Sequence, residues 1–304
     1  MSDNASTDDT EQVVKLASKY SPIRYNRNAK NVGLCPNIVL STLLAKGQFC
    51  WTLGDDDLAR PGAVKKVLQV LKKHPEVDYV YVNFSHITVQ ELRRLASPAL
   101  SKDLPDDLPL GNEDPTERYV SKWEELIDPK ISTTFLASMQ PTVTRQSFWS
   151  RYSRTLERGE FGSSLDATYP HVKILGSALV GKKAYYIGKP WVVVVEGARE
   201  WWGLASMIRL VRLNDVLDFY ELMGVDPARI YRCREYLLTS SGPLILQMLT
   251  KKSTPGREYF SAPRFFLLYW KYKALWLSIF EAARAYDPPI RYVASVLLRT
   301  IRRF

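Results

Sequence analysis

Short strand patterns alternate with short helix patterns along the first 85 residues, and this alternation constrains the fold most strongly. Strands are expected at 23–28, 48–54 and 77–85, and helices at 11–20, 37–47 and 60–75. Asn37 and Gly47 are expected to begin and end the second helix. Strands that are separated by helices usually pair in parallel. The pattern therefore predicts an α/β fold with a mostly parallel sheet flanked by helices.

The second half of the chain gives a weaker pattern. Residues 97–118 are rich in Pro, Asp, Gly and Ser, and they predict a long loop or a joint. The elements expected after it are a helix near 119–128, a strand or helix start at 131–144, a helix at 147–159 and a strand pair at 184–197. From 203 onward the pattern is helical. We therefore expect a sheet-containing part, 1–202, and a helical part, 203–304.

Composition and charge limit the class of protein. The formal net charge is +10, and residues 257–304 carry nine Lys or Arg and three Asp or Glu among many aromatic side chains. Such a tail suits an anionic membrane surface or nucleic acid, but no nucleic-acid reading motif is present, so no nucleic-acid partner is expected. An ordinary core helix with a basic edge explains the tail equally well. The three cysteines, Cys35, Cys50 and Cys233, predict buried thiols and no disulfide framework.

Three consecutive aspartates follow the apolar run that ends at Leu53. Asp55, Asp56 and Asp57 would lie where the predicted strand ends, and ligands of open α/β sheets gather at the carboxyl ends of strands. Carboxylates are the ligands that Mg²⁺ and Mn²⁺ prefer. A solvated acidic turn remains the alternative interpretation.

Two motifs around these aspartates resemble those of a known family. Residues 28–64 contain an N-x-G turn, a helix with an asparagine that ends in A-x-G, an apolar strand and a D-x-D motif; the matching positions are Asn31–Gly33, Asn37, Ala45–Gly47 and Asp55–Asp57. The opening SDNASTDDT is similar to the D-[DN]-x-S-T-D-x-T loop of the same family. In order and spacing, residues 2 to about 85 resemble the family 2 glycosyltransferases of GT-A (Rossmann-like) fold, and among them the abequosyltransferase-like enzymes of bacterial surface-polysaccharide assembly.

The resemblance implies a function and roles for the matched residues. It implies transfer of a sugar, as in a hexosyltransferase, from a nucleotide-sugar donor to a glycan or polyprenyl-linked acceptor, with inversion and with Mn²⁺ or Mg²⁺ as cofactor. Asp3, Asn31, Asp55 and Asp56 would bind the donor, and Asp57 with Asp55 would hold the metal. The basic tail, 257–304, would contact a membrane, which implies a cytoplasmic protein on the inner face of the cytoplasmic membrane.

Residues beyond the matched region are candidates on their own chemistry. Asp166 is the first candidate for the general base that an inverting transfer requires, with Glu160 second and a turn or cap aspartate as the alternative. His171 is a candidate metal ligand, although a histidine beside a proline is often structural. Arg199 and Trp201 would contact the diphosphate and the sugar, or else pack against the helical tail.

One departure from the family pattern leads to a second hypothesis. Family members begin with a central apolar strand, and this chain starts where their second strand ends. A chain without that strand would lose part of the donor pocket and expose a sheet edge. The alternative is therefore a catalytically impaired, truncated remnant or a non-catalytic binding protein of the same fold.

Overall fold

The structure is a computed structural model that describes residues 1–95, 104–157, 159–197 and 200–284. Two compact units make up the chain. Unit 1 comprises Met1–Glu125 and Leu136–Glu196, and unit 2 comprises Leu126–Phe135 and Gly197–Phe304. Unit 2 thus includes the part expected to be helical, 203–304, together with a ten-residue segment from the middle of the chain.

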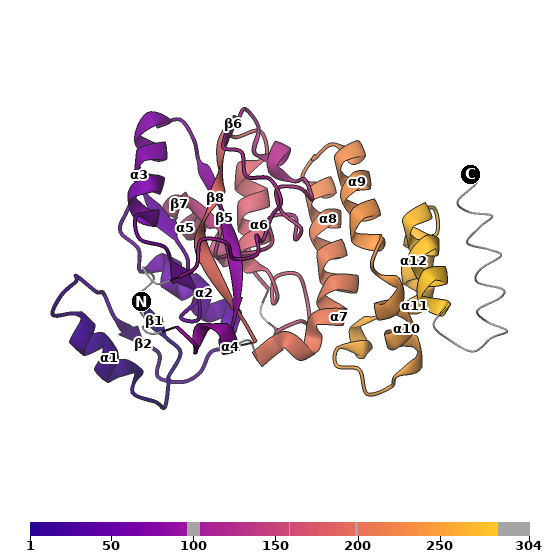
Figure 1. The fold of residues 1–304 in the computed structure, drawn as a ribbon, viewed down its shortest axis with the longest axis horizontal. Coiled ribbons are helices and arrows are strands. Elements are labelled where there is room, and N and C mark those ends of the chain that lie inside the picture. The colour runs from indigo at the N-terminus through magenta and orange to yellow at the C-terminus, as the bar shows by residue number, and fades with distance from the viewer. Residues whose placement is uncertain (96–103, 158, 198–199, 285–304) are drawn as a thin grey trace. The chain divides into compact units, whose positions relative to one another are not determined.

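A six-stranded mixed sheet forms the centre of unit 1 (Figure 1). Its strands, in spatial order, are β3 (Phe49–Trp51), β7 (Thr142–Arg145), β5 (Tyr79–Thr88), β8 (Ala184–Glu196) and β4 (Leu58–Ala59), and β6 (Arg118–Val120) also pairs with β8. The two long strands, β5 and β8, are parallel, and the short strands pair antiparallel. The predicted α/β class is therefore confirmed, with parallel pairing in the long strands of a mixed sheet.

Helices cover both faces of this sheet (Figure 1). They are α3 (Ala63–Lys73), α4 (Val89–Leu92), α5 (Gln146–Tyr152) and α6 (Pro170–Leu179), with 3₁₀ helices at Trp123–Leu126 and Ser153–Thr155. Val80 and Val82 of β5 pack against Val67 and Val70 of α3. The alternate residues of β5 face the other side, where the ring of Tyr79 meets the edge of Trp123. Both faces of the central strand are thus buried, as expected for parallel strands between two helical layers.

A separate two-stranded parallel sheet lies at the N-terminus of unit 1. It pairs β1 (Ser2–Asp3) with β2 (Asn26–Arg27), and α1 (Thr10–Ala17) connects the two strands. α2 (Leu34–Leu43) follows and leads into β3. These elements carry the predicted motifs that precede the three aspartates.

The expected start of α2 is wrong by three residues. The helix begins after Gly33, whose φ of 91° is accessible to glycine at little cost, and Pro36 lies in the first turn, where its missing N–H is no loss. Asn37 is therefore inside the helix and is not its N-cap. The helix at 11–20 is shorter than expected and has Asp9 as its N-cap.

Two expectations for later elements are also corrected. The helix expected near 119–128 is the strand β6 followed by a single 3₁₀ turn. The strand pair expected at 184–197 is one continuous strand, β8, whose register against β5 shifts between Val82 and Phe84. That irregularity accommodates the Gly-Lys-Pro stretch at 188–190, which in the sequence is typical of a break between strands.

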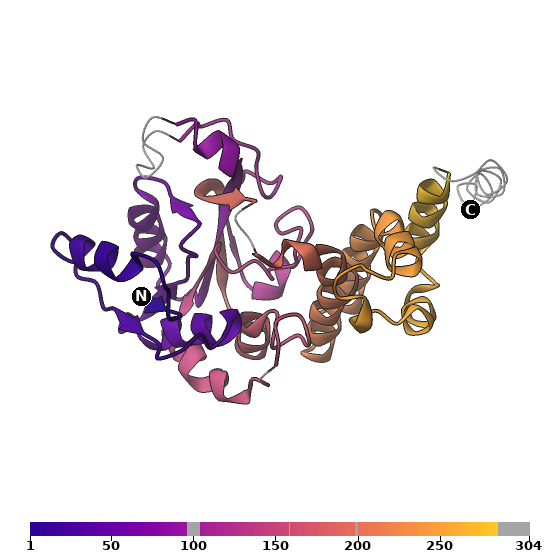
Figure 2. The ribbon, with the colours of Figure 1, turned by 90° about the horizontal axis from the view of Figure 1, so that it is seen from below.

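Unit 2 is helical in its described residues, as predicted (Figure 2). Its α-helices are α7 (Ala205–Met207), α8 (Leu213–Leu222), α9 (Pro227–Leu238), α10 (Gly242–Thr250), α11 (Ala262–Tyr269) and α12 (Lys273–Ala283), with a π-helix at Ile208–Arg212 and 3₁₀ helices at Glu200–Leu204 and Arg257–Tyr259. Within the described part of the chain, no helix has both the length and the apolar character needed to cross a membrane.

The cysteines are free thiols, as predicted. Cys35 and Cys233 are buried and Cys50 is half-buried. Burial raises the pKa of the Cys35 and Cys233 thiols to about 12 and that of Cys50 to about 11. A thiol with so high a pKa is a poor nucleophile at neutral pH, so these side chains act in packing.

Candidate functional site

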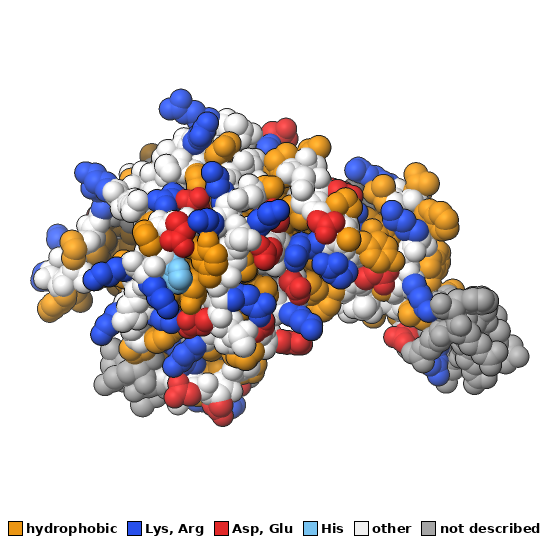
Figure 3. All heavy atoms as spheres, turned by 90° about the horizontal axis from the view of Figure 1, so that it is seen from above, with side chains coloured by type: hydrophobic (Ala, Val, Ile, Leu, Met, Phe, Trp, Pro, Cys, Tyr) orange, Lys and Arg blue, Asp and Glu red, His pale blue; other side chains and the backbone are white. Residues whose placement is uncertain are grey.

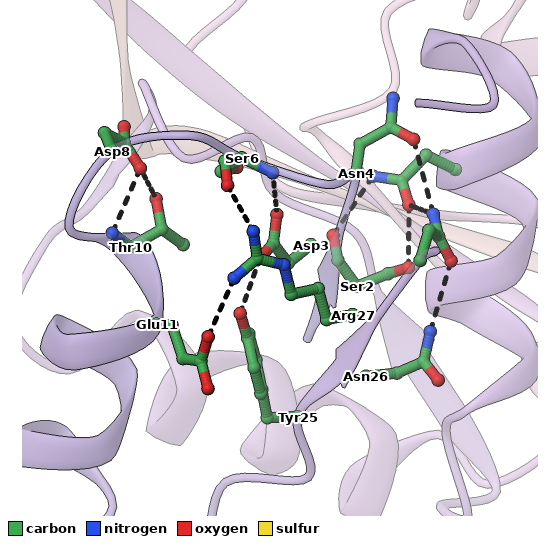
Figure 4. A network of polar contacts seen from close by, with 12 residues as sticks. Ser2, Asp3, Asn4, Ser6, Asp8, Thr10, Glu11, Tyr25, Asn26 and Arg27 are labelled. Carbon is green, nitrogen blue, oxygen red and sulfur yellow. Dashed lines mark hydrogen bonds and ion pairs between the residues drawn. The ribbon is translucent and has the colours of Figure 1, made fainter. Parts of the chain in front are cut away.

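The loop after β1 is organised by the buried carboxylate of Asp3 (Figure 4). The Ser6 amide donates to Asp3 Oδ1 at 2.8 Å, the Tyr25 hydroxyl donates to Oδ2 at 2.5 Å, and Arg27 Nε lies 3.7 Å from Oδ2. The hydrogen bonds from Ser6 and Tyr25 lower the pKa of Asp3 to about 2, and the bond to Asp3 raises the pKa of Tyr25 to about 12. Both oxygens of this predicted donor-binding residue thus have partners within the protein.

The N-x-G turn is joined to the same loop by asparagine side chains. Asn31 Oδ1 accepts hydrogen bonds from Asn4 Nδ2 and from the Gly33 amide, both at 2.8 Å. Asn4 Oδ1 accepts from the Val32 amide at 2.9 Å. The loop after β1 and the turn before α2 are therefore locked together, and Asn31 lies exposed on their surface.

The first turn of α2 also contacts the segment that carries Asp166. Cys35 Sγ donates to the carbonyl of Ala167 at 3.2 Å. A groove of about 500 Å³ lies between these segments, with Val39, Leu40 and Leu43 of α2 on one side and Asp166 on the other. The structure thus brings the predicted donor-binding turn and the predicted general base to the same helix.

Asp166 is held by two donors. Its Oδ2 accepts a hydrogen bond from the Glu157 amide and an ion pair from Lys173 Nζ, both at 2.7 Å, and the residue is buried. Glu160, the second candidate, is exposed, and its carbonyl accepts a hydrogen bond from the Ser163 hydroxyl at 2.7 Å. Of the two, Asp166 has the environment that fixes a carboxylate in one orientation.

The three aspartates form the turn between β3 and β4. Asp55 is exposed, and Asp56 and Asp57 are half-buried. The carboxylates of Asp56 and Asp57 lie close to Gly54. A Cβ atom at position 54 would collide with Asp56 Oδ1. A larger residue at position 54 would therefore displace the Asp56 carboxylate from its present place. Because β3 and β7 are antiparallel, as are β7 and β5, the strand β3 runs in the same direction as β5 and β8. The acidic turn thus follows the carboxyl end of a strand, as predicted.

Two residues at the same edge of the sheet were not predicted from the sequence. His86, near the end of β5, and Glu196, the last residue of β8, form a pair with 3.0 Å between His86 Nδ1 and Glu196 Oε1. They are 110 positions apart, and only the register of β5 against β8 brings them together. The sequence marks each position only as a polar residue at the end of an apolar run, which does not indicate that the two residues pair.

His171 does not join the aspartates. It is buried, and its Nε2 lies 3.0 Å from the carbonyl of Ala137. Burial lowers the pKa of His171 to about 4, so the ring is neutral at neutral pH. Among the described residues, no group of three or more His, Cys, Asp or Glu is arranged to hold a metal. Any cation at the acidic turn would therefore depend on ligands other than His171.

The remaining two candidates lie outside unit 1. Trp201 belongs to unit 2, and its ring centroid lies 6.4 Å from that of Trp202. Arg199 lies outside the described residues.

The face drawn in Figure 3 carries charged side chains of both signs. On this face, Lys and Arg side chains alternate with Asp and Glu across the described surface.

Ligands of open α/β sheets bind at the carboxyl ends of the strands, and the acidic turn lies at that edge of this helix-covered sheet. Residues 1–136 match the model of glycosyl transferase family 2. Over 201 residues the chain is 29% identical to the abequosyltransferase RfbV of Salmonella typhimurium. The aligned region covers 64% of this chain and 55% of that protein. The chain thus spans about half the length of this relative. Over 71 residues it is 32% identical to an uncharacterized glycosyltransferase of Haemophilus influenzae. This alignment covers 23% of this chain and 24% of that protein.

The fold also resembles that of a solved structure. Residues 1–349 of S. aureus TarS superpose with a TM-score of 0.55, at 12% identity, over 99% of this chain and 78% of that one. At this identity the likeness concerns the fold alone. Together with the family match, it confirms the predicted GT-A fold.

Proposed function

We propose that this protein is an inverting, metal-dependent glycosyltransferase that moves a sugar from a nucleotide-sugar donor to a glycan or polyprenyl-linked acceptor in surface-polysaccharide synthesis. The observation that carries the proposal is the acidic turn, Asp55–Asp57, at the carboxyl end of β3 within a family 2 domain. The name of the Salmonella relative, an abequosyltransferase, supports the same class of reaction.

The side chains of the turn fit a divalent cation. Mg²⁺ in particular is usually held by one or two carboxylates together with substrate phosphates, so a complete cage of protein ligands is not required. Asp57 and Asp55 would hold the ion, and Asp56, packed over Gly54, would shape the turn. When bound, the cation would neutralise charge on the departing nucleoside diphosphate.

Asp166 is the general base in this proposal. The acceptor oxygen attacks the anomeric carbon, the bond from that carbon to the donor phosphate breaks, and the acceptor proton passes to Asp166. The ion pair with Lys173 and the bond from the Glu157 amide hold the carboxylate in place. The aliphatic wall of the adjoining groove, on α2, would then receive an apolar part of the acceptor.

The membrane contact proposed for 257–304 is supported by its described part. Leu267, Leu268 and Trp270 are exposed and lie beside the exposed Lys271 and Lys273. Apolar and cationic side chains together suit the headgroup region of an anionic bilayer, which agrees with a cytoplasmic protein on the inner face of the cytoplasmic membrane. Co-sedimentation with phosphatidylglycerol vesicles, but not with phosphatidylcholine vesicles, is the expected result; equal recovery with both would contradict it. Residues 285–304 of this tail lie outside the described residues.

The test of the proposed function is Asp57→Ala. We expect titrations of UDP, GDP, CDP and dTDP in MnCl₂ to find one nucleotide that binds, with affinity falling when EDTA replaces the metal. Asp57→Ala should remove this metal-dependent part, a loss of about 10-fold or more, because the variant lacks one of the carboxylates that would hold the ion. Asp107→Ala, which removes an exposed carboxylate from a loop, is the control. Equal metal dependence in the wild type and Asp57→Ala would overturn the metal assignment.

A non-catalytic binding protein of the same fold is the second candidate, and one observation favours it. The carboxylate of Asp166 is already engaged by Lys173 and the Glu157 amide, which would have to yield before it accepts a proton. Release of nucleoside diphosphate from the matching nucleotide sugar distinguishes the two. Nucleotide binding with no turnover of any offered nucleotide sugar would support the second candidate.

A further inference from the structure

The pair formed by His86 and Glu196 lies at the carboxyl edge of the two longest strands. His86 pairs in register with Val194, and Thr88 pairs with Glu196. The side chains are 29% and 45% exposed, so the pair is partly open to solvent although the strands around it are buried. A polar pair at the end of a buried parallel strand pair is positioned to meet a ligand.

The acidic turn reaches the same level of the sheet. Leu58 of β4 pairs with Val193 and Ala59 with Val192, so Asp57, which directly precedes β4, lies at the level of Val194. Val194 in turn pairs with His86. Asp57 and His86 therefore flank β8 from opposite sides, about 10 Å apart at the backbone, since neighbouring strands are about 4.8 Å apart.

The side chains of these residues share a face of the sheet. Residues two apart on a strand face the same side, so His86 lies on the side of Phe84, and Asp57 on the side of Ala59. Phe84 packs with Val192 and Val194, and its ring lies 5.3 Å from that of His86 in an edge contact. Asp57, His86 and Glu196 thus border one apolar patch.

We propose that His86 is a donor-binding residue that contacts the diphosphate of the nucleotide sugar, and that Glu196 positions it. The inference rests on the proposed function and adds a second group to the site of Asp57. A carboxylate close to Nδ1 restrains the orientation of an imidazole ring, so that Nε2 points away from it toward a ligand. An N–H donor aimed at phosphate oxygens forms a strong, charge-assisted hydrogen bond.

The chain offers a matched control in a second histidine with a glutamate beside it. His74 Nδ1 lies 3.7 Å from Glu76 Oε1, but this pair precedes β5 and so lies at the opposite end of the strand from His86. The His74 ring packs 5.6 Å from Tyr119 and 5.1 Å from Tyr185. A His74 variant therefore measures the effect of removing a histidine ring from unit 1 without removing a group near the acidic turn.

The experiment is titration of full-length variants with the nucleoside diphosphate that the wild type binds, in MnCl₂. His86→Ala should weaken binding by about 10- to 100-fold, the range for a hydrogen bond to a charged group. His86→Asn, which keeps an N–H donor, should recover part of this, and His74→Ala should bind as the wild type does. Unchanged affinity in His86→Ala, with normal loss in Asp57→Ala, would overturn this inference and leave the proposed function intact. Absence of nucleotide binding in the wild type would overturn both.

The role of Glu196 is tested by coupling. Glu196→Ala should weaken binding in the wild-type background and have little further effect in the His86→Ala background, because a residue that acts through His86 has nothing to position once the ring is gone. Equal losses from Glu196→Ala in both backgrounds would show that Glu196 does not act through His86 and would overturn its positioning role.

Discussion

His171 shows how burial decides the role of a single residue. It is one of the chain's three histidines and lies close in sequence to the candidate base Asp166, which makes it a plausible metal ligand. In the fold its ring is enclosed, bonded to the carbonyl of Ala137, and edge-on to Tyr169 at 6.0 Å. Tyr169 lies two residues before His171, but the contact with Ala137 depends on how α6 packs against the chain preceding β7 and is not indicated by the local sequence.

This burial makes the stability of the protein pH-dependent. The pKa of His171 is about 4 in the folded protein and 6.5 in the reference state, so the unfolded chain binds the proton more readily. Stability contributed by this group is therefore present above pH 6.5 and is lost as the pH falls toward 4, by roughly 3 kcal/mol in total. His171→Gln, which can still donate to the carbonyl of Ala137, should remove this loss.

Urea unfolding between pH 7.5 and 4.5 measures the effect. His74→Gln is the control, since His74 is partly exposed and lies beside Glu76. A free energy of unfolding that falls with pH as steeply in His171→Gln as in the wild type would contradict the assignment.

At the scale of elements, Asn37 has a different role from the one its sequence context predicts. An asparagine before an apolar run is typical of an N-cap, yet α2 begins at Leu34 and encloses it. Its side chain instead joins α2 to β1 and to the chain after β2: Nδ2 donates to the Ser2 carbonyl at 3.0 Å, and Oδ1 accepts from the Ser2 hydroxyl at 2.7 Å and from Asn28 Nδ2 at 3.0 Å.

Asn37→Ala should therefore destabilise unit 1 more than a helix substitution normally does. Three hydrogen bonds are lost, at about 1 kcal/mol each, and the Ser2 and Asn28 groups lose their partner. Chemical denaturation should show a decrease of about 2–3 kcal/mol, against less than about 1 kcal/mol for Ser41→Ala, which removes one local bond to Ile38 in the same helix. Equal decreases in the two variants would mean that Asn37 does not connect these elements.

The sequence predicts which elements exist better than how they pair. Alternating patterns locate β5, α2 and α3 to within a few residues, because a buried face imposes its period on the local sequence. The pairing of strands is not determined by such local patterns, because it depends on contacts between distant segments. Examples are the antiparallel position of β7 between β3 and β5 and the register that brings His86 to Glu196. The position of the acidic turn after a strand was therefore predictable, and the pairing of His86 with Glu196 was not.

At the scale of the whole molecule, the two units do not divide the chain at a single point. Leu126–Phe135 belongs to unit 2 although its neighbours on both sides belong to unit 1. The Ile127 carbonyl accepts from Arg229 at 3.4 Å, and the ring of Phe135 meets Tyr236 at 6.4 Å. A composition shift near residue 203 cannot reveal this, because the segment is too short to have a distinctive pattern.

A chain that ends at Glu196 should therefore fold poorly. Ile127, Ile131 and Phe135 are buried, and without the helices of unit 2 each would expose apolar surface worth about 1.5–3 kcal/mol. We expect the 1–196 variant to bind the dye ANS and to aggregate at concentrations where the full chain does not. The same variant with Ile127→Ser, Ile131→Ser and Phe135→Ser should regain solubility, because the exposure of these three apolar side chains causes the aggregation. Cooperative unfolding of the unmodified 1–196 chain without ANS binding would show that unit 1 is independent of the segment's partners.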